Sequence, residues 1–527
     1  MGGPDEAPPP PPHPAPPAPW PFRFVYLSTY AGPALWLPYV SLFLEFKGRT
    51  HPEIGLLMML PRIFTSVCAP VWSLWADEKN CAREVIIAGN IGSTLHTLLF
   101  QLIQPTTSLG LVSLLVSMRA FWNCPCGSLV DGLSTKQLGN DAYGEVRGLG
   151  ALSFAVFSFS GGVLLNLFGF DALFWGFTIL QLASIAVLVT FLPRHASTPP
   201  PPSLSQPPSL SQPRALSAAA SDGSMTHRIW LIFAENRSSS LAFAVVVLLS
   251  GFCFGVIEAF LFLRLTHLGA SGLLLGLARL VMTIVEVPVF WYAAAVVDSL
   301  SRRLAVSADV ASWLMLTVTQ LAFVLRFLCY QALTDPVYVF PAEVLHGFTF
   351  AMMWKIAVQF ASDLAARHVP EATGTMQTLI AGLHFGLGAS VGSVVGGFVF
   401  DWAGPVVLFR LCALLALASA VLAASTTASL HRHDQWAAAG AGGGEGEGGG
   451  GKGRGGGKSK GSGAGTGAGA GGSELDVLDG RPSEHGLMAA AALELEQDED
   501  EDEDEESALP GDERASEQPN CSGAVVA

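Results

Sequence analysis

Charged side chains inside long apolar stretches are the residues of this sequence that could do chemistry. Acids, arginines and a histidine interrupt hydrophobic segments in its second half, namely Glu258, Arg279, Glu286, Arg326, Glu343 and His346. A charge at the centre of a bilayer costs about 2.5–3.5 kcal/mol on insertion scales unless it faces a partner or a water-filled cavity. We therefore interpret these residues as a candidate network of acid, base and histidine.

Helical spacing indicates which of these residues can meet. Arg279 and Glu286 are seven positions apart, so on one helix they share a face at a separation of about 10 Å, which suits flanking a ligand. Glu343 and His346 are three positions apart and can touch. A carboxylate beside a histidine or arginine in a low-dielectric cavity changes protonation with its surroundings. The pattern therefore predicts a site that could link proton binding to solute binding.

Two more arginines, Arg62 and Arg119, lie deep in apolar segments of the first half. Each needs a cavity or an anion to be tolerated there. Together with Arg279 and Arg326 they would line a positively charged cavity. This arrangement favours an anionic or polar solute.

Composition places these charges in a membrane protein. Half of the 527 residues are hydrophobic, only 13% are charged and the mean hydropathy is +0.44, which argues against a single water-soluble core. The net charge of −15 comes almost wholly from residue 431 onward, where 21 acids stand against 7 bases. The remaining residues are nearly neutral and offer no basic face, so we expect no nucleic-acid partner.

Twelve apolar segments reach the length that spans a bilayer, in a scanning window of about 19 residues. They are 22–44, 53–76, 84–104, 108–131, 146–168, 171–193, 240–263, 272–297, 308–332, 337–362, 373–400 and 405–429. We expect an all-α membrane protein with twelve transmembrane helices in two pseudo-symmetric six-helix bundles.

Composition also marks the boundaries of the predicted bundles, which cover residues 21–193 and 240–430. Residues 1–20 are Pro-rich, and residues 194–239 form a Pro/Ser-rich segment that predicts a flexible cytoplasmic linker. Residues 431–527 are Gly-rich and then acidic, which predicts a disordered tail with a possible protein partner.

The two halves share one pattern of residues about 220 positions apart. Gly55, Arg62, Pro70 and Asp77 are followed in the same order by Gly272, Arg279, Pro288 and Asp298, and Gly161, Gly162 and Gly169 by Gly396, Gly397 and Gly404. Weak internal repetition between two long hydrophobic halves is typical of transporters with a site at the interface between related bundles.

Basic residues in the predicted loops give the orientation. Twelve lie on the cytoplasmic side and three on the other if both termini are inside. We therefore expect a multi-pass membrane protein with both termini in the cytoplasm.

No motif of the sequence predicts an enzyme or a cofactor. The eight cysteines lack paired metal-ligand spacing, and no P-loop, nucleophile elbow or zinc motif is present. We expect neither catalysis, nor a bound metal, nor an ATP-driven pump.

The layout resembles the major facilitator superfamily over about residues 22–430. Several stretches look like its sugar or nucleoside proton-symporter branch, which includes the major facilitator superfamily domain-containing protein 6 group. These stretches are Gly55-Leu56-Leu57 through Pro70-Val71-Trp72 to Asp77, Tyr143-Gly144-Glu145-Val146-Arg147, and His346-Gly347-Phe348 through Gln377 to Gly388 and Gly396-Gly397.

The resemblance implies roles for the buried charges. Such symporters couple protons through an acid on the eighth segment, an arginine on the ninth and a His/Glu pair on the tenth, matched here by Glu286, Arg326, His346 and Glu343. The pair runs Glu then His, the reverse of the lactose-permease order. Glu258 is a further candidate in the same network.

The resemblance also implies a substrate site that includes Arg119, Asp131, Arg147, Phe154, Glu286 and Arg326. Arg147 matches a substrate-binding arginine of the sugar symporters, with Asp131 as its expected partner. An alternative for Arg147 is a positive anchor on the cytoplasmic side. Those symporters place a tryptophan where this chain has Phe154, so stacking is expected but a galactoside is not implied.

Gating residues are implied at the cytoplasmic helix ends. The acid of the loop after the second segment corresponds to Asp77, and the bases and the second-half equivalents are Lys79, Arg83, Asp298, Arg302 and Arg303. Ser73 and Asn80 stand where the family motif has glycines, so the gate chemistry is altered.

We expect a secondary active transporter that moves a small polar solute, such as a sugar, nucleoside or organic anion, by alternating access with protons. Its expected partners are the bilayer, the solute and protons. One alternative is a non-transporting receptor or scaffold that retains the fold. A uniporter with a purely structural charge network is another.

Overall fold

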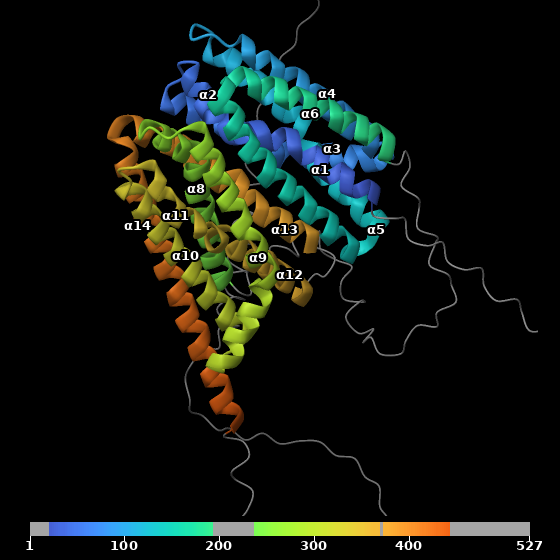
Figure 1. The fold of residues 1–527 in the computed structure, drawn as a ribbon. Coiled ribbons are helices and arrows are strands. Elements are labelled where there is room, and N and C mark those ends of the chain that lie inside the picture. Colours follow the sequence, from blue (N-terminus) through green and yellow to red (C-terminus); the bar gives the residue numbers. More distant parts are fainter. Residues whose placement is uncertain (1–19, 193–236, 369–372, 443–527) are drawn as a thin grey trace, which may run out of the picture. The chain divides into compact units, whose positions relative to one another are not determined.

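The computed structural model describes residues 20–192, 237–368 and 373–442, which lie in one compact unit, Met1–Gly448. Every regular element among these residues is a helix, as Figure 1 shows. The expectation of an all-α fold is confirmed. The predicted linker, most of the Pro-rich start and residues 443–527 of the predicted tail lie outside the described residues, as does the second unit, Gly449–Ala527.

Helices α1 to α6 make up the first half. They are α1 (Trp20–Trp36), α2 (Val40–Phe46), α3 (His51–Glu78), α4 (Ala82–Leu99), α5 (Leu109–Phe168) and α6 (Phe170–Phe191). Short 3₁₀ turns follow α1 and α4.

The second half contains α8 (Arg237–His267), α9 (Gly272–Leu304), α10 (Ala308–Ala332), α11 (Phe340–Val344), α12 (Met353–His368), α13 (Thr373–Ala381) and α14 (Ala389–Gly442). A 3₁₀ turn precedes α11. Two π-helical segments interrupt this half, Gly347–Met352 between α11 and α12 and Gly382–Gly388 between α13 and α14. Because α14 continues to Gly442, helix extends past the expected boundary at residue 430.

Ten helices within the described residues are long and apolar enough to cross a membrane, compared with the twelve segments expected from the sequence. The first expected segment is broken, because a 3₁₀ turn at Leu37–Tyr39 that contains Pro38 divides it into α1 and α2, each shorter than a bilayer crossing. The last two expected segments are joined in α14, where Gly404 bends the backbone with φ 82° and ψ 168°. The difference in number therefore reflects one break and one join.

Hydroxyl caps begin several of the long helices, including α3, α9 and α10. The Thr50 hydroxyl accepts from the backbone N–H of Glu53, whose carboxylate accepts from the Thr50 N–H at 3.0 Å, and together they form a capping box at the start of α3. Ser271 and Ser307 cap α9 and α10 in the simpler way, through one backbone N–H each. These caps fix the residue at which each of these helices begins after a short loop.

Aromatic packing stabilises the interior of each half. In the first half, Trp36 is fully buried against Phe43 and Phe174, with ring centroids 5.2 and 4.5 Å apart. In the second half, Tyr330 packs on Phe409 at 5.5 Å. The same continuous core extends across both halves and so holds them together.

Two glycine seams join the halves, one between α3 and α14 and one between α5 and α9. Gly162 of α5 lies against the backbone of α9, where an added Cβ would be 2.6 Å from the Gly276 Cα. Gly397 of α14 lies against the start of α3, where a Cβ would be 3.0 Å from the Pro52 Cα. Gly162 and Gly397 are equivalent positions of the internal repeat, so the repeat places small residues in both seams, where they allow backbones to approach closely.

We predict that Gly162→Val opens the seam between α5 and α9, because the side chain would overlap the α9 backbone. Spin labels at the exposed residues Phe46 and Leu273, in a background without native cysteines, should show a longer distance in this variant. Gly127→Val is the matched control, since Gly127 lies on the same helix and nothing lies within 4 Å of its added Cβ. Equal distances in the two variants would refute the steric account.

Candidate functional site

Arg326 of α10 is the centre of a buried polar network in the second half. It is 1% exposed, and its Nη2 lies 2.8 Å from the Glu343 Oε2 of α11. Its Nε donates to the Tyr330 hydroxyl at 2.5 Å, and that hydroxyl donates in turn to the Glu343 Oε1 at 2.5 Å. Its Nη1 also donates to the Thr349 hydroxyl at 3.0 Å. The guanidinium and the carboxylate are therefore neutralised and hydrogen-bonded inside the protein, which a buried ion pair requires.

His346 connects this centre to Glu286 of α9. The Arg326 Nη1 lies 2.8 Å from the His346 Nδ1, and the His346 Nε2 lies 2.8 Å from the Glu286 Oε1. A guanidinium has only donors, so Nδ1 must accept and the ring proton of a neutral His346 lies on Nε2. This tautomer donates to Glu286. The hydrogen bonds thus form one continuous chain from Glu286 to Glu343.

Exposure differs sharply along this chain. The side chains of Arg326 and Glu343 are each 1% exposed and that of His346 is 3%, whereas the Glu286 side chain is 20% exposed. Glu286 is therefore the most exposed of these four residues. The other three are shielded.

Glu258 of α8 and Arg279 of α9 form a second ion pair, with 2.6 Å between the Arg279 Nη1 and the Glu258 Oε1 and a second bond at 3.3 Å. The Arg279 and Glu258 side chains are 15% and 18% exposed, so the pair is partly accessible. Phe154 of α5 lies across the seam, with its ring centroid 5.5 Å from the Arg279 guanidinium carbon. This pair is where the second-half charges meet the first half.

Arg62 of α3 also reaches across the interface. Its Nη1 donates to the Met58 carbonyl at 3.0 Å and to the Ser393 hydroxyl of α14 at 2.5 Å. The residue repeats the position of Arg279 in the other half, and both arginines lie at contacts between the halves. The internal repeat therefore places one arginine beside each seam.

Local helix irregularity brings His346 and Glu286 together. His346 ends the tight turn after α11 and precedes the π-helical segment Gly347–Met352, which is a common device at functional sites. Gly347 lies against α9, where a Cβ would be 2.9 Å from the Val285 carbonyl oxygen. This close approach places His346 next to the residue that follows Val285, which is Glu286.

Other residues expected at the substrate site lie within the first half. Asp131 accepts a hydrogen bond from the Tyr26 hydroxyl at 2.5 Å and lies 3.7 Å from the Arg147 Nε, while the Arg147 guanidinium carbon is 5.0 Å from the Tyr30 ring centroid. The expected pairing of Arg147 with Asp131 is thus present as a contact, and its role stays a prediction.

Arg119 is buried in the first half, and its Nε donates to the Thr97 hydroxyl of α4 at 2.9 Å. The contacts described for the second-half network do not include it. Its position therefore supports α4–α5 packing, and its place in a substrate site stays a prediction.

The residues expected to act as gates lie at helix ends. Arg83 donates to the carbonyls of Val189 and Leu192, at 2.6 and 2.8 Å, and so caps the end of α6. Lys79 is an exposed residue 3.8 Å from its neighbour Glu78. Asp77 is the next-to-last residue of α3, and Asp298, Arg302 and Arg303 lie near the end of α9. Their gating role stays a prediction.

Tyr330 and Thr349 complete the network but were not among the expected residues. Tyr330 follows Arg326 by four positions, a spacing that places both on one helix face and could have indicated it. Thr349 follows His346 by three. Arg62 was noted for its charge, but no sequence pattern predicts its bond to Ser393.

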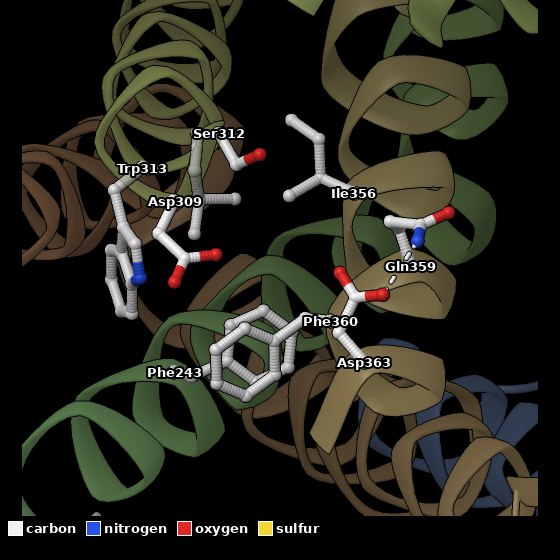
Figure 2. Close-up of a pocket in the computed structure, with 9 residues that line it drawn as sticks. Phe243, Asp309, Ser312, Trp313, Ile356, Gln359, Phe360 and Asp363 are labelled. Carbon is white, nitrogen blue, oxygen red and sulfur yellow. Dashed lines mark hydrogen bonds between the residues drawn. The ribbon is translucent and has the colours of Figure 1, made fainter. Parts of the chain in front are cut away.

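Figure 2 shows a separate small pocket between α8, α10 and α12. The carboxylates of Asp309 and Asp363 face it, and the stacked rings of Phe243 and Phe360, with centroids 4.0 Å apart, line one side. The Asp363 carboxylate accepts from the Gln359 amide at 2.8 Å. The pocket lies inside the second half and shares none of the residues of the network around Arg326.

We predict that Arg326→Ala or Glu343→Ala lowers the free energy of unfolding by about 3–5 kcal/mol, because each leaves a buried charge unpaired. The double variant should lose less than the sum of the two, measured by denaturant titration in detergent. The surface control Arg410→Ala, which loses only a hydrogen bond of 2.9 Å to Gln331, should change stability by about 0.5 kcal/mol or less. Additive losses would show that the pair is not coupled.

Comparisons with known proteins cover most of the described chain. The model of the MFS_1 like family matches residues 20–411. Maltose permease of Geobacillus stearothermophilus is 26% identical over 394 residues, covering 73% of this chain and 89% of the permease. A major facilitator superfamily domain-containing protein 6-like protein of Danio rerio is 29% identical over 198 residues, covering 37% of this chain and 34% of that protein.

Solved structures show the same fold. The crystal structure of nucleoside transporter NupG matches with a TM-score of 0.58 and 16% identity, covering 78% of this chain and 98% of that one. The expected resemblance to the superfamily is confirmed, and the apolar helices make this a multi-pass integral membrane protein. The chain therefore belongs to the MFS_1 like family of the major facilitator superfamily, a family of membrane transporters and not of enzymes.

Proposed function

We propose that this transporter moves a small polar solute by alternating access and couples that movement to protons. The observation that carries the proposal is the continuous chain of hydrogen bonds and ion pairs from Glu286 through His346 and Arg326 to Glu343, accessible only at Glu286. A charge network that served packing alone would have no need of an exposed acid at one end. Protonation of Glu286 changes the charge that faces His346 and, through it, the balance around Arg326.

In this proposal each residue has its own task. Glu286 takes up the proton. His346, which contacts both Glu286 and Arg326, transmits the change in the charge of Glu286 to Arg326, and Glu343 holds Arg326 in place. Glu258 and Arg279 sit between this network and the first half, so a solute bound there would contact both halves. Movement of the two halves would then change the side of the membrane from which Glu286 is accessible.

The proposed substrate class is a sugar or a nucleoside, with an organic anion as a further possibility. Maltose permease and the nucleoside transporter NupG carry such substrates by name, and this chain is similar to both. Phe154 offers an aromatic face beside Arg279 on which a sugar or base ring would stack. Arg119, Asp131 and Arg147 are proposed to extend the polar surface of the site within the first half.

We further propose an arrangement in the membrane. Two bundles, within residues 21–193 and 240–430, would rock against each other along the glycine seams, and both termini would face the cytoplasm. The helix ends with Asp77, Lys79, Arg83, Asp298, Arg302 and Arg303 would form the cytoplasmic gate. A protein partner of the acidic tail is part of the same proposal.

Glu286→Gln tests the coupling, because the carboxamide keeps an oxygen that accepts from His346 but cannot take up a proton. In proteoliposomes with radiolabelled maltose or uridine, this variant should lose accumulation driven by a pH gradient and keep counterflow. Asp171→Asn is the matched control, since Asp171 is an exposed acid in the first turn of α6 and lies outside the network. Accumulation by Glu286→Gln would contradict proton coupling through this residue.

The wild type distinguishes the alternatives. Counterflow by the wild type that does not depend on pH would indicate a uniporter. Absence of exchange by the wild type for a panel of sugars, nucleosides and organic anions would instead favour a non-transporting receptor.

Phe154 gives a second prediction for the same site. Phe154→Leu should raise the apparent KM for the transported solute by about two- to tenfold, because the loss of ring stacking is worth about 0.5–1.5 kcal/mol. Phe154→Trp should retain affinity. Phe168→Leu on the same helix, at a position that is 68% exposed, is the control. An unchanged KM in Phe154→Leu would remove this ring from the proposed site.

A further inference from the structure

Two histidines and a glutamate from different helices converge where the two halves meet. Glu45 lies at the end of α2, His51 begins α3 and His267 ends α8. The Glu45 Oε1 is 2.8 Å from the His267 Nε2 and 3.5 Å from the His51 Nε2. One ligand atom from each of the three lies within 4.8 Å of the others. These residues are about 24–39% exposed, so an ion from solution could reach them.

Two of the three distances between the ligand atoms are close to those at a tetrahedral zinc ion, and one nitrogen from each histidine lies within 4.8 Å of the other. Bonds of about 2.0–2.1 Å at tetrahedral angles put neighbouring ligand atoms about 3.3 Å apart. The two distances from the Glu45 Oε1 lie on either side of this value, so small side-chain movements would suffice. Two imidazoles and one carboxylate also form a ligand set that suits zinc and leaves one position open.

A second layer of contacts orients His51. Its Nδ1 lies 3.0 Å from the Asp401 Oδ1 of α14, so the Nδ1–H would donate to that carboxylate and leave Nε2 free to bind a metal. This carboxylate–histidine arrangement is the usual support of a zinc ligand. The Phe400 ring packs against the His51 ring at 4.5 Å and against the His267 ring at 5.9 Å. Both imidazoles are thus supported before any ion binds.

Without an ion the cluster would stabilise the contact between the two halves only weakly. Partly exposed ion pairs contribute about 0–1 kcal/mol, so the contacts of Glu45 with the two imidazoles add little to stability by themselves. A metal would satisfy all three residues at once. Two imidazoles that neighbouring groups hold in place therefore converge on one carboxylate, an arrangement that a simple surface ion pair does not require.

We propose that Glu45, His51 and His267 form a zinc-binding site that links the first half of the chain to the second. Glu45 and His51 come from the first half and His267 comes from the second. The ligands can meet only when the halves are in contact at this end, so zinc would favour that conformation by its difference in affinity between the two states. Zinc binding itself does not depend on the proposed transport activity.

The direct test is isothermal titration of ZnCl₂ into the purified full-length chain, with any affinity tag removed and excess MgCl₂ present to occupy the acidic segment 498–506. We expect one saturable zinc site. His51→Gln and His267→Gln should each weaken binding by about tenfold or more, and Asp401→Asn should weaken it by about tenfold through the second layer. His433→Gln, at an exposed histidine near the other end of α14, should bind zinc as the wild type does.

A conformational readout separates a linking site from incidental binding. With spin labels at Phe46 and Leu273 in the background without native cysteines, zinc should narrow the distance distribution and shorten its mean, and the effect should be lost in His267→Gln. Thermal melting without zinc checks that each variant is folded, and Glu45→Gln serves as a second ligand variant if a histidine variant fails to fold. Equal zinc affinity in the wild type and in folded ligand variants would overturn the proposal. Binding with no effect on the distance would leave no link between the halves and would overturn that part of it.

Discussion

The cost of placing charge in hydrocarbon is the constraint on which this structure depends. Arg326 and Glu343 are each 1% exposed, and either one alone would be strongly unfavourable inside a bilayer. Together with Tyr330, His346 and Thr349 they satisfy one another, so the charges become tolerable only as a set. The 3₁₀ turn before α11 and the π-helical segment after it rotate successive residues by different amounts, which lets this set converge. Most of the π-helical segment is tolerated because it is covered by protein, since Gly347, Thr349, Ala351 and Met352 are buried.

The halves are joined by a different kind of interaction. Backbone contacts at Gly55, Gly162, Gly272 and Gly397 bring helices close without interlocking large side chains. Arg62 crosses one seam with a hydrogen bond to Ser393, and Arg279 lies over the Phe154 ring across the other. The cluster of Glu45, His51 and His267 lies where α2, α3 and α8 meet. Glycine seams without interlocking side chains allow the two halves to move relative to each other. The ionisable groups beside them could make that movement depend on a bound proton, solute or ion.

Much of the fold could be predicted from the sequence because it depends on local properties. Hydropathy placed the helix of residues 308–332 at its observed bounds and the helix that begins at Gly272 at its observed start, since each crossing must bury its own backbone polar groups. Hydropathy alone could not show the break at Leu37–Tyr39 or the join at Gly404, because both are backbone conformations within stretches that are apolar throughout. The boundary expected at residue 430 came too early for a different reason, because hydropathy falls at His431 whereas the backbone stays helical to Gly442.

The candidate site divides in the same way. The sequence by itself determined which residues are costly in a membrane, because charge and hydropathy are properties of each residue and its near neighbours. It also predicted that Glu343 and His346 can touch, whereas in the structure each contacts Arg326. Only the tertiary structure decided that Glu258 pairs with Arg279, that His346 lies between Arg326 and Glu286, and that Tyr330 and Thr349 complete the network. Those contacts join different helices, and their geometry depends on π-helical segments and glycine seams that set helix rotation and distance. No local pattern encodes that relation, because it arises only when separate helices pack.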